Sequence, residues 1–282
     1  MTFDASAVAA TWLARYERFD VVGSTNDVVA AWLEEGTPEL CVAVAGEQTA
    51  GRGRNGRTWT APPDAALLCS LGFRPTYLDA AQLWQLAAIV SLAMADAAES
   101  VSGAAAGSVR LKWPNDLVVE QSDAVCKLAG VLGETVGAGT EDPRAVIGIG
   151  VNAGWQRAEF PPELAQSMTS VAELAETAGG IGTGAPTAAQ LRDDLLRAFL
   201  DAVRPRLADL HAGRFPAAEW RGRQLTNGEV VRLERPDGTA ELVRAIDVDA
   251  DSGALVVGSL SGEWPARAIT VGEISHLRLA GV

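Results

Sequence analysis

The chain has 282 residues, 48% of them apolar and 21% charged, which is enough for a sizeable core in one large domain or two smaller ones. Its formal net charge of -13 argues against a generic DNA-binding or membrane-surface protein, because both need a basic face. Three widely spaced cysteines without CxxC spacing, and only two histidines, exclude a disulfide framework and disfavour a zinc site or a histidine-based triad.

The first residues carry an acid and no basic segment, so they do not resemble a signal peptide. We find no apolar run of membrane-spanning length and predict a cytoplasmic protein that does not bind a membrane.

The first fifty residues predict two helices, over 5–16 and Asn26–Glu35, and two strands, over Arg18–Val22 and Leu40–Ala45. Ser24 and Asp27 have the spacing of a capping box at the start of the second helix. The hydroxyls and N–H groups at this helix start either only cap the helix or also hold a polar group of a ligand.

The segment 46–59, GEQTAGRGRNGRTW, contains four glycines and three arginines, which is unusual in an acidic chain. Glycine lets a backbone approach a ligand closely, and arginine presents a planar fork of donors that matches phosphate and carboxylate groups. The segment therefore predicts a clamp for a small anion, and a solvated surface loop is the alternative. Its G-x-G-x-x-G spacing does not indicate a dinucleotide site, because Pro62 and Pro63 follow where a helix should begin.

The central part of the chain predicts one long buried helix, over Asp79–Ser100, among several strands. We expect these strands over Ala66–Phe73, Val109–Lys112, Leu117–Glu120, Leu128–Glu134 and Ala145–Val151, with Lys127 at the start of the fourth. Glycines alternate along the last of them, so another group can approach that strand closely. The pattern predicts an α+β or α/β domain.

Towards the C-terminus, helices are predicted over 170–176 and from Pro186 to about His211. From Arg223 the pattern changes to short alternating strands separated by turn pairs such as Asn227-Gly228 and Ser252-Gly253. We therefore predict two domains, 1–220 and a small all-β module over 221–282.

Five motifs now occur in a fixed order: GSTN, GEQTAGRGRNGRTW, LKWPNDLVV, KLAGVLGE and GIGVN. Together they resemble the motif series of the biotin protein ligases over residues 22–152, and VGEIS at 271–275 is similar to the closing strand of that family. The resemblance implies a mixed α/β catalytic domain followed by an SH3-like β-barrel. It also implies that biotin and MgATP form biotinyl-5′-AMP and pyrophosphate, after which the biotinyl group passes to one lysine of a biotin carboxyl carrier protein domain.

The resemblance also implies a role for each matched residue. Lys127, Arg54 and Arg52 would be catalytic, and Asp116 would contact Mg²⁺. The residues implied to bind biotin are Ser24, Thr25, Asn26, Gln48, Arg52, Gly53, Arg54, Trp113, Lys127 and Gly130. Those implied to bind ATP are Arg54, Arg57, Trp59, Lys112, Asn115, Asp116 and Asn152, with Trp59 stacked on the adenine.

Many relatives carry a helix-turn-helix domain before the Ser-Thr-Asn motif, but only 23 residues precede Ser24 here. We therefore expect the monofunctional form without DNA binding, as a monomer or homodimer. A lipoate–protein ligase is the nearest alternative, although it would carry an Arg-Arg-x-x-Gly-Gly-Gly loop and a His-Asp pair. The other alternative is a biotin-binding regulator without catalysis.

Overall fold

The computed structural model describes residues 12–121, 124–179, 186–235, 237–270 and 273–276. In these described residues, the first part of the chain contains seven strands and the helices that cover them. Its strands are β1 (Arg15–Val22), β2 (Cys41–Gln48), β3 (Ala66–Phe73), β4 (Val109–Lys112), β5 (Asp116–Gln121), β6 (Ala124–Val136) and β7 (Arg144–Asn152). Its helices are α2 (Thr25–Glu34), α3 (Trp84–Ser102), α4 (Val171–Thr177), α5 (Ala188–His211) and α6 (Ala217–Gly222), with single 3₁₀ turns at Arg54–Gly56, Ala80–Gln82 and Arg157–Glu159.

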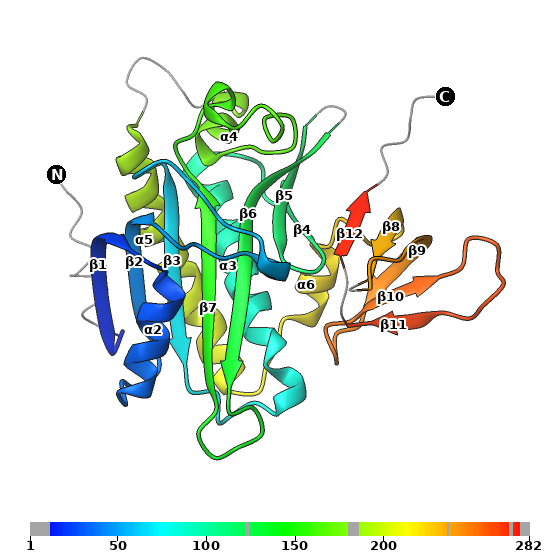
Figure 1. Cartoon of the computed structure of the whole chain (residues 1–282), viewed down its shortest axis with the longest axis horizontal. Coiled ribbons are helices and arrows are strands. Elements are labelled where there is room, and N and C mark those ends of the chain that lie inside the picture. Colours follow the sequence, from blue (N-terminus) through cyan, green and yellow to red (C-terminus); the bar gives the residue numbers. More distant parts are fainter. Residues whose placement is uncertain (1–11, 122–123, 180–185, 236, 271–272, 277–282) are drawn as a thin grey trace.

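The seven strands form one mixed sheet in the order β1-β2-β3-β7-β6-β5-β4. β1 runs parallel to β2, and all other neighbours are antiparallel. α2 lies on one face of the sheet, while α3 and α5 lie on the other (Figure 1). Strand alternation explains this arrangement: in β2, Cys41 and Ala43 pack with α2, whereas Val42 and Val44 belong to the main core with α3 and α5.

By length and composition alone, the helical segment Ala80–Ser102 is long and apolar enough to cross a membrane, which corrects the expectation that no such run exists. In the structure 67% of its apolar window is buried within the protein. The segment packs between the large sheet and α5, so it is the central helix of the core.

The C-terminal part forms a second, antiparallel sheet in the order β11-β10-β9-β8-β12. Its strands are β8 (Val230–Glu234), β9 (Ala240–Val248), β10 (Leu255–Gly258), β11 (Arg267–Ile269) and β12 (Glu273–His276). The turn glycines Gly228, Gly238 and Gly253 have φ values of 86°, 81° and 71°, as the predicted turn pairs require. β11 and β12 are the two edges of this sheet in the described residues, so the structure gives an antiparallel sheet here.

The junction between the two sheets is held by buried charge. Arg223 forms ion pairs with Asp96 and with Glu99, whose side chain is 7% exposed. The backbone around Arg223 also bonds to Leu111 of β4, from Leu111 N–H to Arg223 O (2.9 Å) and from Leu225 N–H to Leu111 O (2.8 Å). The C-terminal sheet is thus attached to α3 and β4, beside the Trp113–Asp116 turn.

Three local predictions need correction. The helix expected over 5–16 lies mostly outside the described residues, and β1 already begins at Arg15. Ser24 is the N-cap of α2 but makes no side-chain capping bond, and the Asp27 carboxylate is paired with Arg52, so the predicted capping box does not form. Lys127 lies within β6, which begins three residues earlier at Ala124.

Candidate active site

The glycine–arginine segment 46–59 joins β2 to β3 and crosses the face of the large sheet that carries α2 (Figure 1). It folds back on itself, with an antiparallel bridge between Arg52 and Thr58 and a bond from Trp59 N–H to Gly51 O (3.0 Å). The tip turns through Asn55 and Gly56, whose φ values are 55° and 71°. No α-helix follows in the described residues from Arg57 to Ala65, which agrees with rejecting a dinucleotide fingerprint.

Glycines on β6 and β7 form a flat floor under this segment. Gly130 and Gly150 are direct partners in the sheet, and the Trp59 indole lies on both. A Cβ added at Gly150 would lie 2.5 Å from Trp59 Cε2, and one added at Gly148 would lie 2.1 Å from Asn26 Oδ1. The close approach predicted from the alternating glycines is confirmed, and the groups that approach are the protein's own Trp59 and Asn26.

The start of α2 provides a buried polar group at one end of this floor. Thr25 donates to Gln48 Oε1 through its backbone N–H (2.7 Å) and its hydroxyl (3.0 Å). Ser70 Oγ lies 2.7 Å from Thr25 Oγ1 and 2.6 Å from Asn26 Oδ1. Ser24, Thr25 and Asn26 are 4%, 3% and 5% exposed, so their polar atoms face a largely dry environment, in which hydrogen bonds are strong.

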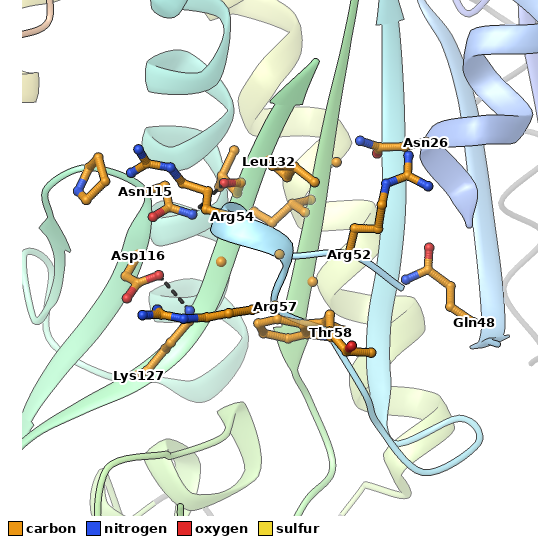
Figure 2. A pocket seen from close by; sticks show the side chains of 18 of the residues that line it. Asn26, Gln48, Arg52, Arg54, Arg57, Thr58, Asn115, Asp116, Lys127 and Leu132 are labelled. Carbon is orange, nitrogen blue, oxygen red and sulfur yellow. Dashed lines mark hydrogen bonds and ion pairs between the residues drawn. The ribbon is translucent and has the colours of Figure 1, made fainter. Parts of the chain in front are cut away.

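The opposite end contains the Trp113–Asp116 turn and Lys127. Lys127 Nζ lies 2.6 Å from Asp116 Oδ1, and both side chains are about three-quarters buried. The same ammonium lies 5.5 Å from the centre of the Trp59 ring. Trp113 precedes a cis peptide bond to Pro114, and its Nε1–H donates to Gly253 O of the C-terminal sheet (3.2 Å). Figure 2 shows Lys127 and Asp116 meeting across neighbouring strands, with Arg57 beside them.

These parts enclose a cavity of about 490 Å³, a size typical of small-molecule sites. Five cationic side chains line it, in a protein whose net charge is -13. All predicted site residues but one contribute to the lining: Ser24, Thr25, Asn26, Gln48, Arg52, Gly53, Arg54, Arg57, Trp59, Lys112, Trp113, Asn115, Asp116, Lys127 and Gly130. Arg54, Arg57 and Lys127 lie toward the end that contains Asp116, whereas Arg52 lies with Asn26 and Gln48 toward the other (Figure 2). A cavity with cations at one end and hydrogen-bonding groups at the other suits a ligand with an uncharged polar head and an anionic tail.

The exception is Asn152, which was predicted to contact ATP. It is 4% exposed and absent from the cavity lining, and its Nδ2 donates to the backbone oxygens of Thr169 (3.0 Å) and Lys127 (3.5 Å). These bonds make Asn152 a link between β6 and the segment that follows β7, and its contact with ATP stays a prediction.

Several residues that line the cavity were not predicted from the sequence, among them Leu164, Met168 and Glu234. Met168 is brought in by a parallel bridge to Lys127, and Glu234 comes from β8 of the C-terminal sheet. Leu164 and Met168 are exposed or half-buried apolar side chains in an irregular segment, which carries no pattern in the sequence. The cavity is therefore closed by groups that only the tertiary structure brings together.

Arg52 is bound by two carboxylates. Its guanidinium binds Asp27 through two bonds (2.9 and 2.7 Å) and also reaches Glu134 (3.1 Å). These carboxylates raise the pKa of Arg52 above its ordinary value, with the hydrogen bond to Asp27 as the largest cause. Arg52 is therefore fully charged and bound to acidic groups of α2 and β6.

A magnesium ion would find one carboxylate within the cationic end of the cavity, Asp116. The described residues contain no group of three His, Cys, Asp or Glu side chains that could hold a metal without other ligands. This suits Mg²⁺, which keeps several waters and uses one or two carboxylates together with substrate phosphates. The residues thus fit a magnesium ion that arrives with a nucleotide.

A mixed sheet with a glycine floor, crossed by an arginine-rich segment over a cation-lined cavity, forms a binding site for a small anionic ligand. The sequence pattern of the Biotin/lipoate A/B protein ligase family matches residues 18–152. The chain is 31% identical over 267 residues to a biotin–[acetyl-CoA-carboxylase] ligase of Mycobacterium tuberculosis, with 93% of this chain and 90% of that protein covered. The protein belongs to this family of biotin protein ligases.

A second relative, the biotin–[acetyl-CoA-carboxylase] ligase of Paracoccus denitrificans, is 30% identical over 250 residues and covers 85% of this chain and 92% of its own. The fold agrees with a solved structure, a biotin protein ligase from Aquifex aeolicus in complex with biotin and ATP. That structure has a TM-score of 0.70 and 24% identity, and it covers 94% of this chain and 99% of its own.

Proposed function

We propose that the protein activates biotin with ATP to biotinyl-5′-AMP and transfers the biotinyl group to a specific lysine of a biotin carboxyl carrier protein domain. The observation that carries this proposal is the cavity itself, which combines a buried polar group around Thr25 and Gln48 with five cations and the Lys127–Asp116 pair. The curated relatives that cover most of the chain are named as ligases acting on acetyl-CoA carboxylase.

The first step joins two anions, so the site must offset their repulsion. A carboxylate oxygen of biotin attacks the α-phosphorus of ATP, a new C–O–P link forms, and pyrophosphate leaves. Negative charge increases on the phosphoryl oxygens in the transition state, and preorganised cations in a poorly solvated cavity stabilise it best. Arg54, Arg57, Lys112 and Lys127 line the cavity and are the groups that would supply this stabilisation.

Lys127 is the residue we assign to the reacting carboxylate. Asp116 holds its ammonium in the cavity at 2.6 Å, so the lysine is positioned before substrates arrive. Ser24, Thr25, Asn26 and Gln48 would bind the ureido ring of biotin, with Trp113, Gly53 and Gly130 along its path. Arg52 and Arg54 would lie over the acyl phosphate. The triphosphate would be bound by Arg57, Lys112 and Asn115, and the adenine would stack on Trp59.

In the second step the neutral amine of the acceptor lysine attacks the carbonyl carbon of the mixed anhydride. The C–O bond to phosphate breaks, AMP leaves, and the amine loses a proton. The protein needs no nucleophile of its own for this transfer, because it supplies position and charge stabilisation. Mg²⁺, when bound with ATP at Asp116, would neutralise charge on the phosphate oxygens.

We further propose that residues 1–220 form the catalytic domain and that 221–282 form an SH3-like β module, of which the five-stranded antiparallel sheet is the described part. Glu234 supports a role for this module at the cavity, since it lines the same space as Lys127. The free thiols of Cys41, Cys69 and Cys126 support a reducing compartment such as the cytoplasm.

The direct test is biotin transfer to a recombinant carrier domain, detected with streptavidin and by mass. We expect labelling that requires both ATP and biotin and that fails on a carrier whose acceptor lysine is replaced by arginine. Lipoate offered in place of biotin should give no transfer. Transfer of lipoate instead of biotin would move the assignment to a lipoate ligase, and binding of biotin without transfer would indicate a regulator.

A further inference from the structure

Two carboxylates outside the predicted site tie Arg52, in the first arm of the glycine–arginine segment, to the body of the protein. Asp27 on α2 accepts two bonds from the Arg52 guanidinium, at 2.9 and 2.7 Å. Glu134 on β6 accepts from the same guanidinium at 3.1 and 3.2 Å. Arg52 is thus bound to two structural elements that are distant from the segment in sequence.

Glu134 also connects this ion pair to the buried polar group at the start of α2. Asn26 Nδ2 donates to Glu134 Oε2 at 2.6 Å, while Asn26 Oδ1 lies 2.6 Å from Ser70 Oγ. Asn26 is 5% exposed, and both atoms of its amide group are occupied, so its orientation is fixed. Figure 2 shows Asn26 and Arg52 on the same side of the cavity. Arg52, next to the tip of the segment, is therefore connected to the end of the cavity that contains Thr25.

The charges in this group argue against Arg52 as the main attractor for substrate anions. One guanidinium bound by two carboxylates leaves a net charge of about -1 on the group. Arg54, Arg57, Lys112 and Lys127 line the same cavity and contribute to the attraction for phosphate. What the Arg52 group provides is position, because the bridge from Arg52 to Thr58 couples its placement to both arms of the segment.

We propose that Asp27 and Glu134 are positioning residues that act through Arg52 to hold the tip of segment 46–59 across the cavity before biotin binds. This rests on the proposed ligase function, which it deepens. A segment with four glycines has many conformations, and only those that cross the cavity place Arg54 over it. The apparent affinity for a substrate falls in proportion to the fraction of protein in the binding-competent state.

The test uses Asp27→Asn and Glu134→Gln in the full-length chain, with two readouts. The first is tryptic cleavage after Arg54 and Arg57 without substrate, which reports the position of the tip independently of activity. The second is the biotin KM and kcat in ATP–pyrophosphate exchange. Each variant should be cleaved faster and show a KM for biotin about three- to tenfold higher, with kcat within about twofold of wild type.

Glu17→Gln is the matched control. Glu17 pairs with Arg15 at 3.1 Å and its side chain is 44% exposed, against 3.1 Å and 41% for Glu134 with Arg52. The control should match wild type in both readouts. Arg52→Lys should behave like the two carboxylate variants, because an ammonium cannot bridge both partners, and adding Glu134→Gln to it should change little further.

Unchanged cleavage and unchanged biotin KM in both carboxylate variants would overturn the proposal, as would faster cleavage with no rise in KM. A drop in kcat at constant KM would also overturn it, since that indicates a direct role in the reaction. Absence of exchange in the wild-type protein would count against the ligase assignment, while the cleavage readout would still decide whether Asp27 and Glu134 hold the tip.

Discussion

Gly150 is the position at which one added methyl group reports most clearly on the site. It lies on β7 under the Trp59 indole, and a Cβ there would be 2.5 Å from Cε2, 2.8 Å from Nε1 and 2.9 Å from Cζ2. All three distances are shorter than real Cβ contacts allow. Gly150→Ala therefore forces the indole off the glycine floor, whereas the sheet backbone around it has no reason to move.

The free-energy cost of Gly150→Ala follows from this displacement of the indole. Overpacking of this kind costs about 1–3 kcal/mol, which is about a fivefold to 150-fold effect on an equilibrium or rate. Trp59 is half-buried and belongs to the movable segment, so we expect this cost in ligand binding and a fall in Tm of under about 3 °C. With Trp59 assigned to the adenine, the KM for ATP in pyrophosphate exchange should rise at least fivefold in Gly150→Ala.

Gly133→Ala on the neighbouring strand β6 is the control. Its Cβ would meet only Ile147 Cδ1, at 3.3 Å, which is the end of a flexible side chain. Exchange kinetics and thermal unfolding of both variants beside wild type would show whether the Gly150→Ala clash weakens ATP binding or the folded sheet. A wild-type KM for ATP in Gly150→Ala would refute the placement of Trp59 at the nucleotide, and a large loss of Tm would show that the clash is absorbed by the sheet instead.

Other parts of the molecule give three further predictions. Gly253→Ala places a Cβ 2.7 Å from Trp84 Cδ2 at a φ of 71° and should lower the free energy of unfolding by about 2–4 kcal/mol. Gly262→Ala is the control, with a φ of 77° and no atom within 4 Å of the added Cβ, and should lower it by about 1 kcal/mol. Equal effects of the two substitutions in urea unfolding would contradict this prediction. Burial raises the pKa of Cys41 to about 11 and of Cys69 to about 12, so neither thiol should react with iodoacetamide at pH 8.5 until denaturant is added; prompt labelling of native protein would contradict this. Because these folded-state pKa values exceed that of an exposed thiol, the free energy of unfolding should also fall as the pH rises above about 9. Asp116→Asn removes the charge that holds Lys127 Nζ at 2.6 Å and should lower the rate of ATP–pyrophosphate exchange about tenfold to 100-fold. It should also raise the Mg²⁺ concentration that gives the half-maximal rate. An unchanged magnesium dependence would argue against Asp116 as the metal contact.

Much of the fold was predictable where local sequence patterns are strong. The run at 66–73 became β3 with the predicted boundaries, since a short apolar run between proline-containing segments has well-marked ends. The helix expected to continue past Pro205 to about His211 is α5, Ala188–His211, with Pro205 inside it. The short helix α6 was missed because its six residues give too few turns for a periodic pattern.

The candidate site was predictable in its residues but less so in its partners. Motif spacing identified fifteen residues that line the cavity, whereas Asn152 lies outside the lining. That Arg52 binds Asp27 and Glu134 depends on the distance between α2 and β6, and that Met168 pairs with Lys127 depends on the path of an irregular segment. Contacts between segments so far apart in sequence leave no local pattern.

Adenylation of biotin in this cavity can be measured as biotin-dependent exchange of pyrophosphate into ATP, with wild-type protein beside Lys127→Ala and Arg54→Ala. Both substituted side chains line the cavity, and neither is fully buried, so the variants should fold. We predict exchange with biotin and none with lipoate, reduced at least 100-fold in Lys127→Ala and strongly in Arg54→Ala. Wild-type protein that exchanges no pyrophosphate with biotin, or variants as active as wild type, would contradict the adenylating site described here.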